Sequence, residues 1–186
     1  MSKKALVFLA DGFEEVEAIT PIDYLRRAGV ELTTVSISDS RMVTGSHGIP
    51  VTADAVLADI AGADSSVYDA MLLPGGMPGA ANLAASGGVG GLLKGQAAAG
   101  RIVAAICASP AVVLAPLGLL AGRRFTCYPG MEGTVRGAKW SEERVVIDGN
   151  IVTSRGAGTA AEWAIALIGT LVGKRDGEKV AGAVLL

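Results

Sequence analysis

The feature that most constrains this chain is a series of short, unbroken apolar runs that alternate with segments of helical periodicity. Three such runs lie within residues 4–9, 68–73 and 102–106, and small or turn-forming residues end each of them. Strands of a parallel sheet are buried on both faces, so they are apolar throughout rather than at alternate positions. Strands separated by helices predict an α/β fold with a mostly parallel sheet and helices on both of its faces.

The other segments extend this pattern into one domain over residues 1–186, because no repeat or linker divides the chain. Pro21 lies inside the first helix, and we expect it to cause a kink or a restart with Thr20 as the cap. The expected helices cover residues 14–28, 80–85, 89–99, 159–172 and 179–185, with another beginning at Pro110. Further strands are expected at residues 31–37, 124–127, 144–147 and 150–154, with a hairpin or two edge strands over residues 42–53.

Composition and charge exclude several classes of protein. Hydrophobic residues make up 51% of the chain and charged residues 18%, which excludes intrinsic disorder. A net charge of −2 without a basic stripe argues against a nucleic-acid partner. The uncharged segment 102–122 is interrupted by Pro110 and Pro116, so we expect no membrane span. The first apolar run is cut at Asp11 and lacks a signal-peptide cleavage pattern, so we expect a cytoplasmic protein.

Cys107 is the strongest candidate for chemistry. It stands between a buried strand and an expected helix start, with the small residues Ala105 and Ser109 two positions to either side. This is the pattern of a nucleophile elbow. The helix start predicts a thiol pKa below the ordinary value. A buried structural cysteine is the alternative, and we expect that simpler role for Cys127, which lacks this context.

Glu17 and the Gly75-Gly76 pair follow other strands and are expected at the same edge of the sheet. Glycine N–H groups there can form part of an oxyanion site, or simply a tight turn. A carboxyl group beside a thiolate is held protonated, so Glu17 can donate a hydrogen bond to sulfur and shuttle a proton.

His47 is the only histidine, and it precedes Cys107. No histidine follows the cysteine, which excludes a Cys-His-acid triad of the glutamine-amidotransferase type. One histidine and two distant cysteines also make a zinc site improbable, so we expect no metal.

Four motifs in order resemble the ThiJ/PfpI superfamily, and within it the branch of the parkinsonism-associated deglycase and the bacterial ThiJ-like proteins. The resemblance extends over residues 4–173. The motifs are Gly12-x-Glu14-Glu15-x-Glu17, Leu73-Pro74-Gly75-Gly76, Ala104-Ala105-Ile106-Cys107-Ala108-x-Pro110 and Thr153-Ser154-Arg155-Gly156-x-Gly158-Thr159.

This resemblance implies a flavodoxin-like sandwich, a homodimer and no organic cofactor. It implies a reactive Cys107 hydrogen-bonded by protonated Glu17, with the N–H groups of Gly76 and Ala108 as the oxyanion site. The chain departs from the family at three positions. Tyr128 stands where some glyoxalase relatives have a histidine, Ser109 where glycine is frequent, and His47 where the branch places an arginine that reaches the neighbouring subunit's site.

Three functions follow as hypotheses. In the first, Cys107 attacks methylglyoxal, glyoxal or their adducts on thiols and amines, and Glu17 moves the proton that leads to lactate or another 2-hydroxy acid. In the second, oxidation of Cys107 makes the protein an oxidative-stress sensor or redox-regulated chaperone. In the third, the protein is structural and its cysteine is a relic.

Overall fold

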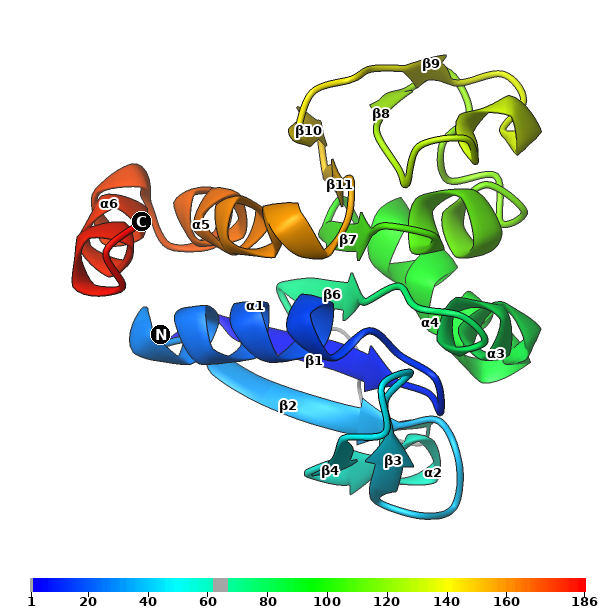
Figure 1. The fold of residues 1–186 in the computed structure, drawn as a ribbon, viewed down its shortest axis with the longest axis horizontal. Helices are drawn as coiled ribbons and strands as arrows, with labels where there is room; N and C mark the ends of the chain where they lie inside the picture. Colours follow the sequence, from blue (N-terminus) through cyan, green and yellow to red (C-terminus); the bar gives the residue numbers. More distant parts are fainter. Residues whose placement is uncertain (1, 62–66) are drawn as a thin grey trace.

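Figure 1 shows the fold in a computed structural model that describes residues 2–61 and 67–186. Seven strands form one sheet in the order β10-β11-β7-β6-β1-β2-β5. All neighbouring strands are parallel except the pair β10 and β11. The strands are β1 (Lys4–Leu9), β2 (Glu31–Ser36), β5 (Ala55–Val56), β6 (Ala70–Leu73), β7 (Ile102–Ile106), β10 (Val145–Asp148) and β11 (Ile151–Ser154).

Strand β1 shows why the sequence folds in this way. Ala5, Val7 and Leu9 pack into one hydrophobic cluster, whereas Leu6 and Phe8 pack into another on the opposite face of the sheet. Side chains alternate between the two faces of a strand, so an unbroken apolar run fills both cores at once. The buried parallel strand expected here is confirmed.

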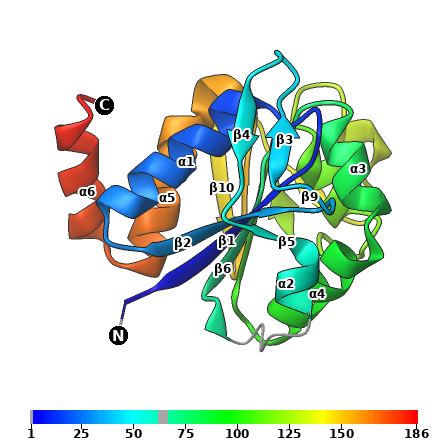
Figure 2. The same ribbon diagram turned by 90° about the horizontal axis from the view of Figure 1, so that it is seen from below.

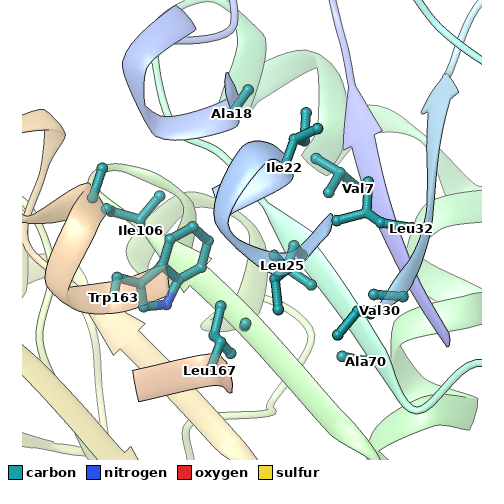
Figure 3. Packing of buried hydrophobic residues seen from close by; sticks show 14 of the residues in the cluster. Val7, Ala18, Ile22, Leu25, Val30, Leu32, Ala70, Ile106, Trp163 and Leu167 are labelled. Carbon is teal, nitrogen blue, oxygen red and sulfur yellow. The ribbon is translucent and has the colours of Figure 1, made fainter. Parts of the chain in front are cut away.

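Helices cover both faces of the sheet, and Figure 2 shows the three layers. One face carries α1 (Glu15–Arg27), α5 (Ala160–Leu171) and α6 (Lys174–Ala183), and the other carries α2 (Leu57–Ala61), α3 (Gly79–Ala85) and α4 (Gly87–Ala98). In the first layer, Trp163 of α5 packs near Leu25 of α1 and Ile106 of the sheet (Figure 3). The predicted α/β sandwich is therefore confirmed.

The expected hairpin is also present, as β3 (Met42–Thr44) and β4 (Pro50–Thr52). Two backbone hydrogen bonds attach it to the loop after β1, since Gly12 N–H donates to the Thr44 carbonyl and Ser46 N–H to the Phe13 carbonyl. The hairpin therefore lies beside the start of α1. A separate pair, β8 (Arg124–Phe125) and β9 (Lys139–Trp140), is parallel.

Several expectations about the helices were wrong in detail. α1 runs without a restart from Glu15 to Arg27, and Pro21 lies on its buried side. Tertiary packing of that side outweighs the backbone hydrogen bond that proline removes. The helix expected from Pro110 is a single π turn, Pro110–Leu114. The last helix begins earlier, at Lys174 rather than residue 179. The short elements β5, α2 and β9 were not anticipated.

Within residues 2–61 and 67–186, no helix is both long and apolar enough to cross a membrane.

Candidate active site

Four of the predicted site residues, Glu17, Gly75, Gly76 and Cys107, meet at the carboxyl ends of three neighbouring strands. β1, β6 and β7 are adjacent and parallel, so the segments that follow them leave the same edge of the sheet. Glu17 comes from the first turns of α1, Gly75 and Gly76 follow β6, and Cys107 follows β7. Such an edge is where open α/β sheets form their sites.

Cys107 occupies the sharp turn expected of a nucleophile elbow. Its φ of 64° lies in the left-handed region, which is rare for a residue with a side chain and often marks a functional site. Hydrogen bonds fix the turn on both sides, because Cys107 N–H donates to the Ser154 carbonyl at 3.0 Å and Tyr128 N–H donates to the Cys107 carbonyl at 2.8 Å. The thiol is partly exposed.

Ser109 supports this turn in a way that the sequence analysis missed. Its hydroxyl is fully buried and donates to the Pro74 carbonyl at 2.6 Å. The bond joins the segment after β7 to the segment after β6, and so holds Cys107 against the two glycines. The only available signal was a hydroxyl group in an otherwise apolar stretch.

Glu17 is 1% exposed, and the N–H of Gly75 donates to its Oε2 at 2.8 Å. This contact changes the role predicted for Gly75. Its N–H holds the carboxyl group and does not face an oxyanion. A Cβ on Gly75 would lie 2.7 Å from Cys107 Cβ and 2.7 Å from Glu17 Oε2, so glycine is what allows the two side chains to meet.

Glu17 and Cys107 form a buried, hydrogen-bonded pair. Burial raises the pKa of Glu17 to about 7, while the N–H of Gly75 and the thiol of Cys107 act in the opposite direction. Burial also raises the pKa of Cys107 to about 12, and the charge of Glu17 and the hydrogen bond with it add to the rise. The raised pKa of Glu17 has the direction expected from sequence.

The lowered thiol pKa expected from sequence is wrong for this arrangement. One π turn follows Cys107 in place of a full helix, so little dipole favours the thiolate. The thiol also faces a buried carboxylate. Because the two groups titrate as a pair, ionised Glu17 keeps the proton on sulfur, whereas protonated Glu17 would favour the thiolate.

Two backbone N–H groups face the sulfur from the other side. Those of Gly76 and Ala108 oppose the rise in the pKa of Cys107, as donors directed at developing negative charge do. These are the two groups that the family resemblance implied as the oxyanion site. The sulfur opens into a hollow of about 440 Å³, largely apolar, lined by Gly76, Met77, Cys107, Ala108, Tyr128, Pro129, Gly130 and Met131.

His47 lies in the turn of the hairpin and does not line this hollow. Its Nδ1 lies 2.9 Å from Glu15 Oε2 and 3.5 Å from Glu14 Oε2. The hydrogen bond with Glu15 is the main cause of a raised pKa of His47. These three residues can offer ligand atoms to a metal ion. The sequence analysis expected no metal and did not consider this group, because His47 is more than thirty positions from the two glutamates and meets them only in the fold.

Glu15 has an anchoring role that the sequence did not indicate. It is 6% exposed and accepts hydrogen bonds from the N–H groups of His47, at 2.8 Å, and Ile49, at 3.4 Å. Burial by itself raises the pKa of Glu15, but the hydrogen bonds with His47 and the backbone outweigh it and lower the pKa to about 2. Glu15 therefore fixes the hairpin turn to α1 as an ionised group.

Cys127 is fully buried, and burial raises the pKa of its thiol to about 11. Cys127 is not among the residues that line the hollow above Cys107, which supports the structural role expected for it.

Comparisons with known proteins agree with this fold. The model of the "DJ-1/PfpI family" matches residues 3–170. The chain is 41% identical over its whole length to protein DJ-1 homolog B of Arabidopsis thaliana, of which it spans 42%, so it covers less than half of that relative. It is 40% identical to protein dj-1beta of Drosophila melanogaster, with 100% of this chain and 98% of that protein covered.

Two further similarities bear on chemistry. The chain is 36% identical to the glutathione-independent glyoxalase DJR-1.2 of Caenorhabditis elegans, over 92% of this chain and 90% of that protein. Its fold matches the structure of oxidized Toxoplasma gondii DJ-1 with a TM-score of 0.95 and 40% identity, covering 99% of this chain and 98% of that one.

Proposed function

Because the chain belongs to the DJ-1/PfpI family, we propose that it is a cofactor-independent cysteine enzyme that converts methylglyoxal and related α-oxoaldehydes, free or as thiol or amine adducts, to 2-hydroxy acids. The observation that carries this proposal is the hydrogen bond between Cys107 and Glu17, together with the N–H groups of Gly76 and Ala108 that donate to the sulfur. The C. elegans relative is named a glyoxalase, which supports the same class of reaction.

The pKa of Glu17 suits it to act as a general base near neutral pH. As the sulfur of Cys107 bonds to the aldehyde carbon, the thiol proton passes to the Glu17 carboxylate. The aldehyde oxygen gains the negative charge, which the N–H groups of Gly76 and Ala108 stabilise until Glu17 passes the thiol proton to that oxygen and becomes a carboxylate again.

The remaining steps move hydrogen within the substrate. The Glu17 carboxylate removes the proton from the former aldehyde carbon and returns it to the neighbouring ketone carbon, while the hydroxyl proton on the first carbon moves to the ketone oxygen. The first carbon is thereby oxidised to a carbonyl and the second is reduced to an alcohol. The resulting thioester on Cys107 is cleaved by water, releasing lactate and the thiol. One methylglyoxal and one water give one lactic acid, so no external oxidant or cofactor is needed.

Release of lactate from methylglyoxal tests this proposal. We expect activity from the wild type, and losses of at least about a hundredfold in Cys107→Ala and Glu17→Gln, since each removes a reacting group. Cys127→Ala is the matched control and should retain activity, because that thiol is buried away from the hollow. Equal lactate release by wild type and Cys107→Ala would contradict the proposal.

A second candidate function is sensing of oxidants through Cys107, as a stress sensor or redox-regulated chaperone. The thiol is partly exposed, and a protonated Glu17 can donate a hydrogen bond to an oxygen added to the sulfur. The structure of the Toxoplasma relative is described as oxidized. Intact mass after graded peroxide tests this: one or two oxygens on Cys107 at low peroxide support it, and no modification before unfolding opposes it.

We also propose that two copies of the chain associate through the exposed apolar residues Val16 and Ile19 of α1 and Ile49 of the hairpin. Their exposed fractions are 48%, 43% and 55%. Val16 and Ile19 are three positions apart and share a helix face, and Ile49 N–H reaches the neighbouring Glu15. Both cysteines are free thiols, which suits a reducing compartment, and we propose the cytoplasm.

A further inference from the structure

A second hollow adjoins the one above Cys107, and the proposed chemistry does not use it. Its volume is about 370 Å³, and it shares Tyr128 and Pro129 with the first hollow. The rest of its lining is Arg144, Arg155 and residues 156–159. It therefore contains Arg155 and Gly156 of the Thr153–Thr159 motif, and the proposed mechanism gives neither residue a role.

The sheet places this hollow beside the reacting pair. β11 is the neighbour of β7 (Figure 1). Cys107 N–H donates to the carbonyl of Ser154, the last residue of β11. Arg155 is the next residue along the chain. A Cβ on Gly156 would lie 3.6 Å from Tyr128 Cδ2 and 3.8 Å from Glu17 Oε1. A substrate held by Cys107 can thus extend past Tyr128 into the second hollow.

The two arginines that line this hollow differ in whether a carboxylate neutralises their charge. Arg144 is neutralised, because its Nε donates to Glu162 Oε2 at 2.6 Å and its second guanidinium nitrogen donates to the Gly158 carbonyl. Arg155 is half-buried, and its guanidinium donates to the Glu142 carbonyl at 3.1 Å. In the part of the chain that the structure describes, no carboxylate pairs with Arg155.

A guanidinium that lines a hollow and bonds a backbone carbonyl rather than a carboxylate has the chemistry to bind a carboxylate, because its planar donors match the two oxygens. The positive charge of Arg155 also lowers the pKa of the Cys127 thiol, and so opposes the rise that burial causes. Two carboxylates beside the hollow are occupied: Glu162 pairs with Arg144, and Glu17 faces Gly75 and Cys107.

We infer that the second hollow is a subsite for an anionic group of the substrate, and that Arg155 binds it. This inference rests on the proposed function and narrows its substrate class. The substrates it favours are adducts of an α-oxoaldehyde with a thiol or amine that itself carries a carboxylate. The aldehyde carbon lies at Cys107 and the carboxylate lies beyond Tyr128.

The first test does not depend on turnover. N-iodoacetylglycine and N-iodoacetylglycinamide alkylate a thiol in the same way, with an S–C bond formed and iodide released, but only the first carries a carboxylate. Their rates with Cys107, followed by intact mass, give a ratio from which the ionisation of the thiol cancels. The rate with the neutral reagent also reports whether a variant is folded around Cys107.

We expect this anionic-to-neutral rate ratio to fall about fivefold in Arg155→Met and to be largely restored in Arg155→Lys. Arg175→Met is the matched control, since it removes the same charge from an exposed position on α6. Its ratio should equal that of the wild type. An unchanged ratio in Arg155→Met, or an equal fall in Arg175→Met, would overturn the subsite.

A second measurement uses lactate release from methylglyoxal hemithioacetals of 3-mercaptopropionate and 3-mercaptopropanol. Arg155→Met should raise KM about fivefold for the anionic adduct and leave KM for the neutral adduct unchanged. A wild type that releases no lactate but shows the expected alkylation ratio would refute the enzyme and retain the anion subsite. Lactate release with an unchanged ratio would refute the subsite alone.

Discussion

The N–H of Gly75 donates to Oε2 of Glu17 at 2.8 Å, and the position that a Cβ on Gly75 would occupy lies 2.7 Å from that same oxygen. Gly75 therefore holds the buried carboxyl group of Glu17 and, because it lacks a side chain, also leaves the space in which that carboxyl group meets Cys107. A glycine is required at this point by the close approach of two side chains.

We predict that Gly75→Ala separates Glu17 from Cys107. The added methyl group must displace one of the two side chains, which should cost about 1–3 kcal/mol of unfolding free energy and slow lactate release at least tenfold. Urea denaturation and the lactate assay measure the two effects. Gly91→Ala is the control: it is exposed in α4 with open space around it, and helix propensity should make it neutral or stabilising by about 1 kcal/mol. Wild-type activity in Gly75→Ala would contradict the geometry.

The stability of the wild type should fall with rising pH because of Glu17. Its pKa is raised from 4.5 to about 7 on folding, so the native state binds the extra proton and the unfolded state releases it. The stabilising effect of that proton is complete below about pH 4.5 and is lost as pH rises through 7. Relative to Glu17→Gln, the wild type should lose about 3 kcal/mol over this interval. Urea titrations of both proteins from pH 4.5 to 8 measure this loss of unfolding free energy. If the unfolding free energies of the two proteins changed in parallel with pH, Glu17 would not titrate in this way.

The ionisation of Cys107 should depend on the charge of Glu17. In the wild type, burial and the Glu17 carboxylate keep the thiol protonated well above neutral pH. Glu17→Gln removes the negative charge and retains a hydrogen-bonding group, so the thiol pKa should fall. Ultraviolet absorbance of the thiolate against pH, in a Cys127→Ala background, follows this directly. A thiol pKa that is equal or higher in Glu17→Gln would be the opposite of our expectation.

Glu15 should stabilise the hairpin only while it is ionised. Its pKa is lowered to about 2, so its contribution is complete above about pH 4.5 and disappears as pH falls toward 2. Glu15→Gln should therefore destabilise the protein by about 1–3 kcal/mol at pH 7, from the loss of charged hydrogen bonds to the turn, and by less at pH 3. Glu14→Gln is the control, since among the described residues the Glu14 carboxylate has weaker contacts with the turn, to Ser46 Oγ at 3.4 Å and His47 Nδ1 at 3.5 Å. Equal effects of the two substitutions at pH 7 would argue against the anchoring role.

Ile49→Lys should weaken self-association without unfolding the chain. Ile49 is 55% exposed, so a lysine there removes apolar surface from the proposed contact and costs little in the isolated fold. Sedimentation of the wild type should give twice the mass of one chain, and the variant a larger share of single chains. A wild type that is monomeric at high concentration would refute the dimer.

The sequence by itself determined the layered fold and the position of the nucleophile, because both follow from local patterns. An unbroken run such as Lys4–Leu9 must be buried on both faces, and a cysteine between small residues at a strand end points to an elbow. The tertiary structure decided everything that depends on residues far apart in the chain. It turned Gly75 from an oxyanion donor into the partner of Glu17, joined Glu15 to His47, and brought Arg155 beside Tyr128. It also reversed the expected shift in the pKa of Cys107, because burial and a facing carboxylate are properties of the folded surroundings that no local pattern encodes.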